Sequence, residues 1–369
     1  MLSLVLRIRH FLYDKGLKKV RRADVPTVCV GNITVGGTGK TPHTEMILRL
    51  LQESDWAGNL NLAVLSRGYK RRSRGFQQVM LDSKASFCGD EPLQIKKKFP
   101  AVTVAVDKDR VEGCDFLAHP EKLQEKNRRT RRCKDRLLPS AELIVLDDAF
   151  QYRRLKAALD IVLVDYNRPV CKDRLLPFGR LRDLPSRLRA ADIIIVTKCP
   201  HELDNWEKTS FAYGLGLPDF ATSASCGTNL DGKRQHVFFS RVEYEAPQPV
   251  FEDSDPRYIY SKRLILFTGI AKDLPLRRYL SDSYKIVSHY SFPDHHRFSA
   301  ADFASMAAAV RKWPTAALAT TEKDAQRVLG SGKVPKELRE RMFEVPIRAE
   351  FLSGAERGLF GKLLQEALG

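Results

Sequence analysis

The sequence predicts an α/β protein with a mostly parallel sheet flanked by helices, a smaller second α/β domain and an N-terminal amphipathic helix. Three observations predict it. Short apolar runs recur at helix-length intervals, the pattern changes after residue 225, and the first 22 residues combine leucines with basic side chains. A chain of 369 residues, 43% of them hydrophobic, is long enough to bury two cores.

The strands of the first domain are predicted from apolar runs rich in β-branched residues. Because these runs are continuous rather than alternating, both faces of each strand are expected to be buried, as in a parallel sheet with helices on either side. The predicted strands are Thr27–Val30, Leu62–Leu65, Val102–Val106, Leu143–Leu146, Ile161–Val164 and Ile193–Val196. They predict a large domain at residues 23–225.

Residues 226–250 are predicted to form a linker with a hairpin arm, because polar turn residues precede the apolar stretch Val237–Tyr244. A smaller α/β domain is predicted at residues 251–369. Its predicted strands are Leu264–Phe267, Ile286–Tyr290 and Ala317–Thr320. Ser299 and Asp302 form a capping-box pattern before an apolar helical face.

The N-terminal segment carries much of the basic excess. The chain has 62 Lys+Arg against 45 Asp+Glu, a net charge of +17, and residues 1–22 contribute seven basic side chains against Asp14. Arg7 and Arg9 interrupt the apolar run too early for a helix that spans a bilayer. The segment is predicted to be an interfacial helix on an anionic membrane. A basic helix docked on its own domain is the alternative.

The cysteines and the second basic cluster argue against several classes of site. The seven cysteines are scattered and form no C-x-x-C pair, which favours a reducing cytosol over a disulfide framework or a zinc site. The basic cluster Lys122–Arg136 is predicted to be a solvated helix or loop. Because no nucleic-acid recognition motif accompanies it, nucleic acid is not an expected partner.

Residues 31–41, GNITVGGTGKT, follow the first strand and precede a helix, which is the setting of a P-loop. Backbone N–H groups of such a loop bind phosphate, its lysine reaches the β/γ-phosphates and its hydroxyl faces Mg²⁺. The predicted nucleotide-binding residues are Val35, Gly36, Gly37, Thr38, Gly39, Lys40, Thr41 and Pro42. The loop is a variant, since Thr34 occupies the first glycine position of the strict pattern.

Carboxylates at strand and loop ends supply the other candidates. Asp147 and Asp148 end an apolar strand, as in a Walker-B strand, and with Thr41 they are the predicted Mg²⁺ ligands. Asp90 and Glu91 stand in a turn before a helix, where a general base or a helix cap is possible. The segment 292–296, FPDHH, follows a strand, and one of its histidines can polarise an acid in the other domain.

The chain resembles the tetraacyldisaccharide 4′-kinases of lipid A synthesis. The resemblance lies in an ordered series of motifs across most of the chain. They are GNITVGGTGKTP (31–42), SRGY (66–69), GDEP (89–92), KDR (108–110), LDDAFQ (146–151), LLPFGRLRD (175–183), FTGI (267–270), FPDHH (292–296) and TEKDA (321–325). The resemblance implies phosphoryl transfer from MgATP to the 4′-hydroxyl of a tetraacyldisaccharide 1-phosphate lipid at the cytoplasmic face of the inner membrane, by a peripheral protein.

The resemblance also implies roles for individual residues. Asp90 would be the general base, His295 its orienting partner from the second domain, and Glu91 a neighbour that tunes the site. Lys40 and Thr41 would bind the β/γ-phosphates and the metal. The candidates to neutralise phosphate are Arg67, Arg110 and Arg182, with Arg180 an alternative to Arg182.

The chain departs from the family pattern at Ala149 and Tyr152, where the commoner sequence has glycine and histidine. The stretch 120–140 is longer than is usual, and it holds one of two identical CKDRLLP segments.

Three other functions were weighed. A partition-type ATPase needs a lysine where Val35 stands, and a GTPase motif at Thr197–Lys198 needs an acid where Pro200 stands. A membrane or nucleic-acid adaptor with a relic P-loop predicts that Lys40 is dispensable.

Overall fold

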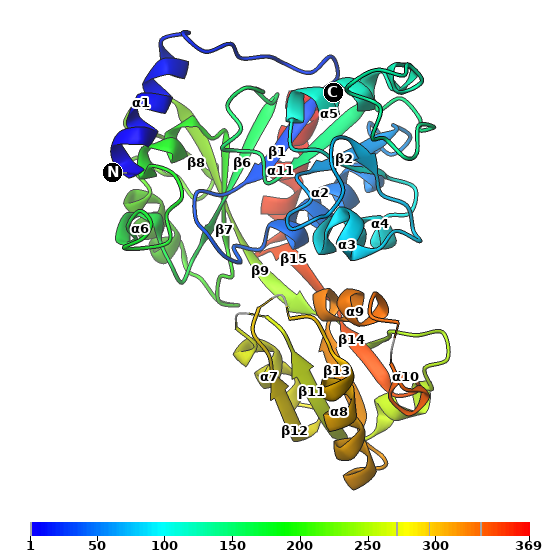
Figure 1. Ribbon diagram of the computed structural model, residues 1–369. Helices are drawn as coiled ribbons and strands as arrows, with labels where there is room; N and C mark the ends of the chain where they lie inside the picture. Colours follow the sequence, from blue (N-terminus) through cyan, green and yellow to red (C-terminus); the bar gives the residue numbers. More distant parts are fainter. Residues whose placement is uncertain (1, 271, 295, 333) are drawn as a thin grey trace.

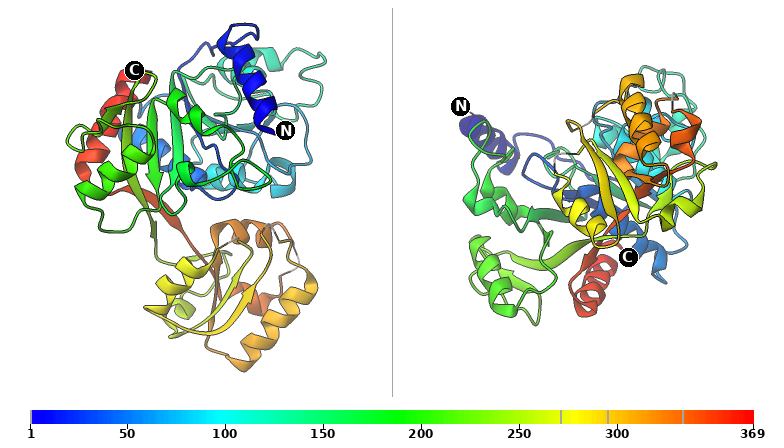
Figure 2. Two further views of the ribbon diagram at one scale, coloured as in Figure 1. Left: turned by 90° about the vertical axis from the view of Figure 1, so that its left-hand side faces the viewer. Right: turned by 90° about the horizontal axis from the view of Figure 1, so that it is seen from below.

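The computed structural model describes residues 2–369 except 271, 295 and 333, and it shows two bodies joined by strands β9 and β15 (Figure 1). Among these described residues the larger sheet has ten strands and the smaller has five. Figure 2 shows the same two bodies from the side and from below. The predicted α/β class with a mostly parallel sheet and a second, smaller sheet is therefore confirmed.

The large sheet has the strand order β15-β9-β7-β6-β1-β5-β2-β4-β3, with β8 paired to β9. Its central strands, from β9 to β4, run parallel, and β3, β8 and β15 are antiparallel to their neighbours. The strands are β1 (Thr27–Gly31), β2 (Leu62–Ser66), β3 (Gln77–Gln78), β4 (Thr103–Val106), β5 (Leu143–Asp147), β6 (Leu159–Asp165), β7 (Ile193–Thr197), β8 (Cys226–Thr228), β9 (Arg234–Tyr244) and β15 (Ile347–Phe351). All six predicted strands of the first domain are present.

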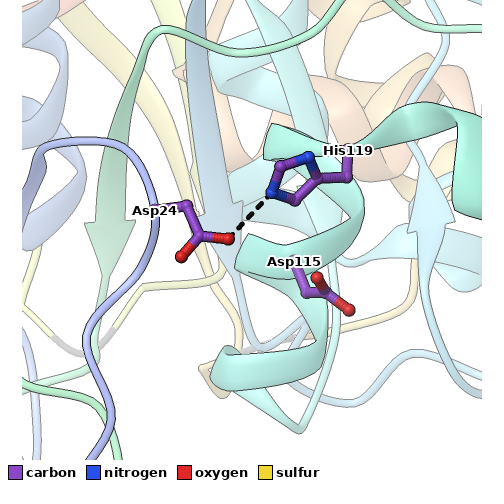
Figure 3. A group of neighbouring side chains, drawn as sticks. All are labelled: Asp24, Asp115 and His119. Carbon is purple, nitrogen blue, oxygen red and sulfur yellow. Dashed lines mark hydrogen bonds and ion pairs between the residues drawn. The ribbon is translucent and has the colours of Figure 1, made fainter.

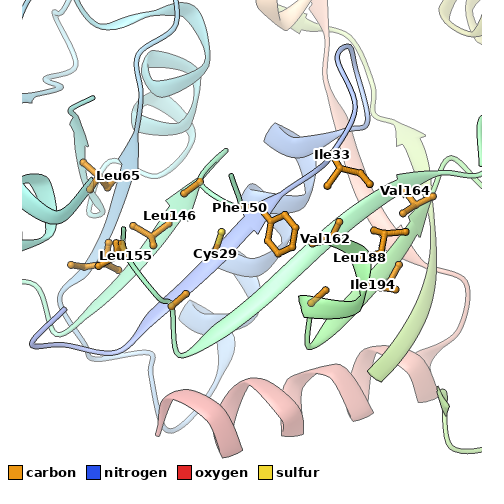
Figure 4. Packing of buried hydrophobic residues seen from close by; sticks show 14 of the residues in the cluster. Cys29, Ile33, Leu65, Leu146, Phe150, Leu155, Val162, Val164, Leu188 and Ile194 are labelled. Carbon is orange, nitrogen blue, oxygen red and sulfur yellow. The ribbon is translucent and has the colours of Figure 1, made fainter. Parts of the chain in front are cut away.

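Two apolar layers enclose this sheet. Alternate residues of β1 point to opposite faces, so that Cys29 belongs to one buried cluster and Val28 and Val30 to the other. Figure 4 shows the first cluster, in which Phe150 and Ile33 pack beside residues of β5, β6 and β7. Burial of both faces explains why these strands read as continuous apolar runs.

The helices of the larger body lie on both sides of the sheet. Residues of α2, α4 and α11 join the cluster on one face, and residues of α5 and α6 join the cluster on the other. The helices are α1 (Leu2–Asp14), α2 (Lys40–Glu53), α3 (Ala85–Cys88), α4 (Asp90–Lys98), α5 (Arg110–Ala118), α6 (Asn205–Gly214) and α11 (Gly354–Leu368).

The small sheet has the strand order β10-β14-β13-β11-β12 and contains all three strands predicted for the second domain. Its strands are β10 (Gln248–Pro249), β11 (Arg263–Thr268), β12 (Lys285–Ser291), β13 (Ala317–Thr321) and β14 (Met342–Val345). Its helices are α7 (Leu274–Ser281), α8 (Ala300–Lys312), α9 (Glu322–Leu329) and α10 (Lys336–Arg339). The predicted capping box of Ser299 and Asp302 begins α8.

The chain returns to the larger body at its end. Strand β15 pairs with β9 in the large sheet, and Phe360, Leu364 and Leu368 of α11 pack into the large core. The second domain is predicted to include residues 251–369. In the structure, however, the residues after 346 form β15 and α11, which belong to the larger body. A short strand in which apolar and charged residues alternate fits the edge of either sheet, so its sequence does not indicate which one it joins.

The N-terminal helix, α1, is shorter than the predicted segment 1–22 and lies against the larger body (Figure 1). Leu6 and His10 are buried, and His10 Nε2 lies 2.6 Å from Asp183 Oδ1. The structure thus shows one face of α1 docked on its own domain.

The basic cluster Lys122–Arg136 forms turns after a short 3-10 helix, Pro120–Leu123, and packs beside α5. The seven cysteines are all free, in accord with the sequence prediction.

Candidate active site

The predicted P-loop connects β1 to α2 and is anchored by its own domain. Gly36 and Gly39 have φ angles of 108° and 84°, which favour glycine because a Cβ is strained there. Asn32 Nδ2 donates to Thr38 Oγ1 at 2.6 Å, and Thr197 Oγ1 donates to the carbonyl oxygen of Thr38 at 3.0 Å. Both of these contacts to Thr38 come from the larger body itself.

The structure brings the predicted nucleotide-binding residues to the N-terminus of α2. Val35, Gly36 and Gly37 form the exposed tip of the loop, whereas Thr38, Thr41 and Pro42 are buried. Helix α2 begins at Lys40, so that Pro42 lies in its first turn. Free N–H groups and the helix dipole make such an end a binding site for phosphate.

Asp147 ends β5 and is buried beside β1 and β2. Ser66 Oγ donates to its Oδ2 at 3.0 Å, and Thr44 Oγ1 donates to its Oδ1 at 3.5 Å. Burial, together with the charges of Glu91 and Asp148, raises the pKa of Asp147 to about 6. The ionised form of this carboxylate is therefore disfavoured by burial and by its two carboxylate neighbours.

Asp148 has a different environment from its neighbour. Arg182 donates to both of its carboxylate oxygens, with Nη1 to Oδ2 at 3.2 Å, and Lys40 Nζ lies 3.9 Å from Oδ1. Burial raises the pKa of Asp148, but Lys40 and Arg182 outweigh it, so the net shift is downward. Arg182 also donates to the carbonyl oxygen of Asn32 at 3.3 Å, which ties the clamp to the P-loop.

Arg180 and Arg182 are alternative candidates to neutralise phosphate, and the structure shows different contacts for the two. The carbonyl oxygen of Arg180 accepts from the N–H of Val35 at 2.7 Å, and the Arg180 side chain is exposed. The segment 180–182 therefore lies along the P-loop, with Arg182 on the carboxylate pair and Arg180 at the loop tip.

The predicted Mg²⁺ ligands, Thr41, Asp147 and Asp148, offer hard oxygen donors of the kind that Mg²⁺ prefers. The hydrogen bonds to the carboxylate of Asp147 come from hydroxyl groups, and its ionisation is opposed by neighbouring carboxylates. A divalent cation would relieve that repulsion. The residues present therefore fit the metal.

A separate group of side chains has metal-ligand character, but its charges are satisfied within the protein. Asp24, Asp115 and His119 form the group of three ligand-type side chains in the described part of the chain, with atoms within 4.8 Å of one another (Figure 3). Asp115 forms ion pairs with Lys122 at 2.6 Å and Arg129 at 3.0 Å. We interpret the group as an ion-pair network that fixes the loop on α5.

Arg110, a predicted phosphate ligand, is 2% exposed. Its Nη1 donates to the carbonyl oxygen of Asp107 at 2.6 Å, and its Nη2 donates to those of Asp147 and Asp148 at 3.2 and 3.3 Å. Because main-chain carbonyls occupy the guanidinium, we interpret Arg110 as support for the turn that carries the two carboxylates. Arg67, the other candidate, is exposed.

Tyr152, one of the two departures from the family pattern, supports the same turn. Its hydroxyl donates to Asp109 Oδ1 at 2.7 Å, and Asp109 caps the N-terminus of α5. Burial and the carboxylate of Asp109 raise the pKa of Tyr152. The phenol thus holds the helix that begins with Arg110, while Ala149 is buried in the core.

The predicted base and its neighbour begin α4. Gly89, which precedes them, has φ of 104° and ψ of 156°, a conformation that L side chains rarely adopt. Arg327 Nε lies 2.9 Å from Asp90 Oδ2, and Lys323 Nζ lies 2.7 Å from Glu91 Oε1. Both cations belong to α9 of the second domain.

Of the two carboxylates that begin α4, Glu91 is the one that the charge of the P-loop lysine affects. Burial raises the pKa of Glu91, but Lys323 and then Lys40 outweigh it, so its pKa is lowered. The charges of Lys40 and Asp148 both act on Glu91, so the start of α4 faces the P-loop lysine.

His295, the predicted partner of Asp90, lies outside the described residues. The nearby Asp294 contributes to the pKa of Lys323, which burial lowers and Glu91 raises, with a net upward shift. The charge of Asp294 therefore acts on the same junction between α4 and α9.

Sequence reasoning missed several residues of this site. Lys323 lies in the quoted TEKDA segment without a role, and Arg327 lies just outside it. Lys198, weighed only as part of a GTPase motif, donates to the carbonyl oxygen of Gly37 in the P-loop. Asn32 and Ser66 lie within quoted motifs, and their polar side chains next to glycines and strand ends were the available signal.

A glycine-rich turn at a helix N-terminus, next to a buried strand that ends in carboxylates, is the arrangement of P-loop NTPases, and the chain is of that class. The family model for tetraacyldisaccharide-1-phosphate 4′-kinase matches residues 1–368. The chain belongs to that family.

Similar proteins agree with this assignment. Proteins named tetraacyldisaccharide 4′-kinase from Phocaeicola vulgatus and Porphyromonas gingivalis are each 36% identical to the chain. The first match covers 94% of this chain and 87% of the relative, and the second covers 97% and 92%. The crystal structure of LpxK from Aquifex aeolicus in complex with ATP has a TM-score of 0.69 at 25% identity, over 100% of this chain and 96% of that one. The prediction of a kinase is confirmed.

Proposed function

We propose that the chain transfers the γ-phosphoryl group of ATP to the 4′-hydroxyl of a tetraacyldisaccharide 1-phosphate lipid, at the cytoplasmic face of the inner membrane. The proposal is supported by the pairing of Lys40 in the P-loop with Asp148, at 3.9 Å, and by the acidic first turn of α4, Asp90 and Glu91, where the charge of Lys40 helps to lower the pKa of Glu91. This arrangement supports a proposed base that lies near the proposed phosphate site. The printed names of the relatives supply the acceptor, and the solved LpxK structure supplies ATP.

The P-loop is proposed to hold the triphosphate. Residues 35–42 would surround the phosphates with N–H groups, and Lys40 would contact the β- and γ-phosphates. Thr41, Asp147 and Asp148 would hold Mg²⁺, which neutralises phosphate charge when it is bound.

Asp90 is proposed to take the proton of the 4′-hydroxyl. As the hydroxyl oxygen bonds to the γ-phosphorus, the bond from that phosphorus to the β–γ bridging oxygen breaks, and ADP leaves. The charge of the transition state lies on the phosphoryl oxygens, so positive groups and correct placement supply most of the catalysis. Arg182 and Lys40 provide that charge, and Glu91 with His295 is proposed to set the surroundings of the base.

The exposed face of α1 supports the proposed membrane site. Leu4, Val5, Ile8 and Phe11 are 52–63% exposed, although they are apolar. Arg7 is exposed among them. Exposed apolar side chains next to basic ones suit the surface of an anionic bilayer. No helix in the described part of the chain is long and apolar enough to cross a bilayer.

Transfer of label from γ-labelled ATP to purified disaccharide 1-phosphate lipid tests the reaction, with protein and RNA as competing acceptors. We expect label on the 4′ position of the lipid alone. Label on another acceptor, or none on the lipid, would refute the proposed reaction.

Sedimentation with anionic vesicles tests the membrane site. The double variant Ile8→Asp/Phe11→Asp changes exposed residues of α1, and Trp206→Asp, on exposed surface of α6, is its control. We expect roughly tenfold weaker partitioning of the first variant only. Equal partitioning of both variants would refute the role of α1.

A further inference from the structure

We infer that Arg327 of the second domain is the positioning residue for the proposed base Asp90, so that the kinase site is complete only when α9 contacts α4. The inference rests on the proposed function of Asp90 and adds a residue to it. Arg327 lies 237 positions from Asp90 in the chain, on the other body of the molecule.

The contacts of Arg327 fix its guanidinium firmly. Its side chain is 7% exposed, and its Nε donates to Asp90 Oδ2 at 2.9 Å. Its Nη1 donates to Asp324 Oδ1 at 2.7 Å and to the carbonyl oxygen of Gly269 at 3.0 Å. One end of the guanidinium is thus held by its own domain, while Nε reaches across to the other.

Asp324, which anchors Arg327, is itself held in place. It is fully buried, and its Oδ2 accepts from the N–H of Gly269 at 2.8 Å and from Thr321 Oγ1 at 2.7 Å. A buried carboxylate with these partners is a rigid support. The position of Arg327 is therefore set by the end of β11 and the start of α9.

A second ion pair, between Lys323 and Glu91, joins α9 to α4 beside the Arg327–Asp90 pair. Lys323 and Arg327 are four residues apart and lie on one face of α9. They meet the consecutive carboxylates Glu91 and Asp90 in the first turn of α4. Two contacts of this kind fix both the distance and the rotation of α4 relative to α9.

Orientation is the chemical reason for the role. A carboxylate accepts a proton efficiently only when one oxygen points at the hydroxyl that attacks. A charge-assisted hydrogen bond to Oδ2 restricts rotation of the Asp90 carboxylate. Misplacement of a reacting group by about 1 Å costs roughly 10²-fold in rate. Loss of Arg327 should therefore lower turnover without affecting the P-loop.

The test compares Arg327→Ala and Arg327→Lys with Arg311→Ala, in which an exposed arginine of the same domain is removed. We expect Arg327→Ala to lower kcat roughly 10–10²-fold with the KM for ATP changed less than about twofold. Arg327→Lys should retain more activity, and added guanidinium ion should restore part of kcat in Arg327→Ala only. The thermal unfolding midpoint of each variant checks folding.

Combination with Asp90→Asn separates positioning from a general structural role. If Arg327 acts through Asp90, then Arg327→Ala should cause little further loss in the Asp90→Asn background. Equal losses in both backgrounds, or a normal kcat in a folded Arg327→Ala, would overturn the inference. Normal kcat in Asp90→Asn would instead refute the proposed base. Should Arg327→Ala fail to fold, the same comparison is made with Arg327→Lys.

Discussion

Two groups of carboxylates in the candidate site obtain their positive partners from different places. Asp148 is paired with Lys40 and Arg182 of its own domain. Asp90 and Glu91 are paired with cations of α9 in the other domain. The first arrangement joins residues of one body, whereas the second joins residues of both bodies and needs them to be in contact.

This difference suggests a division of labour. The phosphate site is built by one domain, so ATP is expected to bind whether or not the bodies are in contact. The site of the proposed base is built by both, so transfer is expected to wait for their contact. Such an order protects ATP from hydrolysis before the acceptor is present.

The largest expected effect comes from the group that depends on both domains. Asp90→Ala should lower kcat by roughly 10²–10⁴-fold, as for loss of a general base, while ATP binding persists. Steady-state kinetics and a fluorescent ATP analogue measure the two quantities. Near-normal turnover would remove Asp90 from this role.

Arg182→Ala tests the group that depends on one domain. Because Arg182 clamps Asp148 beside the P-loop, we expect roughly 10–10²-fold weaker ATP binding and no change in the radius of gyration. Titration calorimetry and small-angle scattering report these. Arg189→Ala, in which an exposed arginine paired with Asp231 is lost, is the matched control. Unaltered affinity for ATP in Arg182→Ala would contradict the comparison.

A smaller effect is expected from the second contact between the bodies. Lys323→Gln should lower kcat only a few-fold and increase the radius of gyration, since the ion pair with Glu91 is partly exposed. A double-mutant cycle with Glu91→Gln should give a coupling of about 0.5–3 kcal/mol. Additive effects of the two changes would mean that the pair does not join the bodies.

The smallest effect concerns Glu45, which shares Lys98 with Glu322 of the second domain. Lys98 Nζ lies 2.9 Å from Glu45 and 2.5 Å from Glu322, and Arg49 also lies near Glu45. Burial raises the pKa of Glu45 from 4.5 to about 7, although Lys98 opposes the shift. The folded protein therefore keeps a proton that the unfolded chain has released.

Because the folded pKa of Glu45 is raised, its stabilising contribution is present below pH 4.5 and is lost as the pH rises to 7. Glu45→Gln should remove this loss. Its free energy of unfolding relative to the parent should increase between pH 5 and 8, by an amount on the order of 1 kcal/mol. Urea unfolding measures this, with Glu53→Gln, an exposed position of α2, as control. A difference that is flat with pH would contradict the assignment.

The sequence indicated those parts of the site whose residues lie next to one another in the chain. The apolar strand Thr27–Gly31, the glycines and the following helix are contiguous, and so are the strand and carboxylates of Leu143–Asp148. Parallel neighbours end at the same edge of a sheet, so the meeting of these two segments follows from the fold class.

Arg110 and β15 show where such reasoning fails. The KDR motif of the family resemblance suggests that Arg110 is a phosphate ligand, but the buried Arg110 side chain donates to main-chain carbonyls instead. The strand Ile347–Phe351 falls within the predicted second domain, residues 251–369, but it pairs with β9 in the large sheet. Side-chain type and periodicity do not specify which partner lies opposite.

The sequence alone determined the P-loop class, the kinase resemblance and the residues proposed to carry phosphate chemistry, because each is encoded within a short run. Only the tertiary structure decided that Arg327 meets Asp90, that Arg110 supports a turn, and that α1 has one docked and one exposed face. These features depend on contacts between residues far apart in the chain. The burial and the charged neighbours of such residues are set by tertiary packing rather than by the residues adjacent in the sequence.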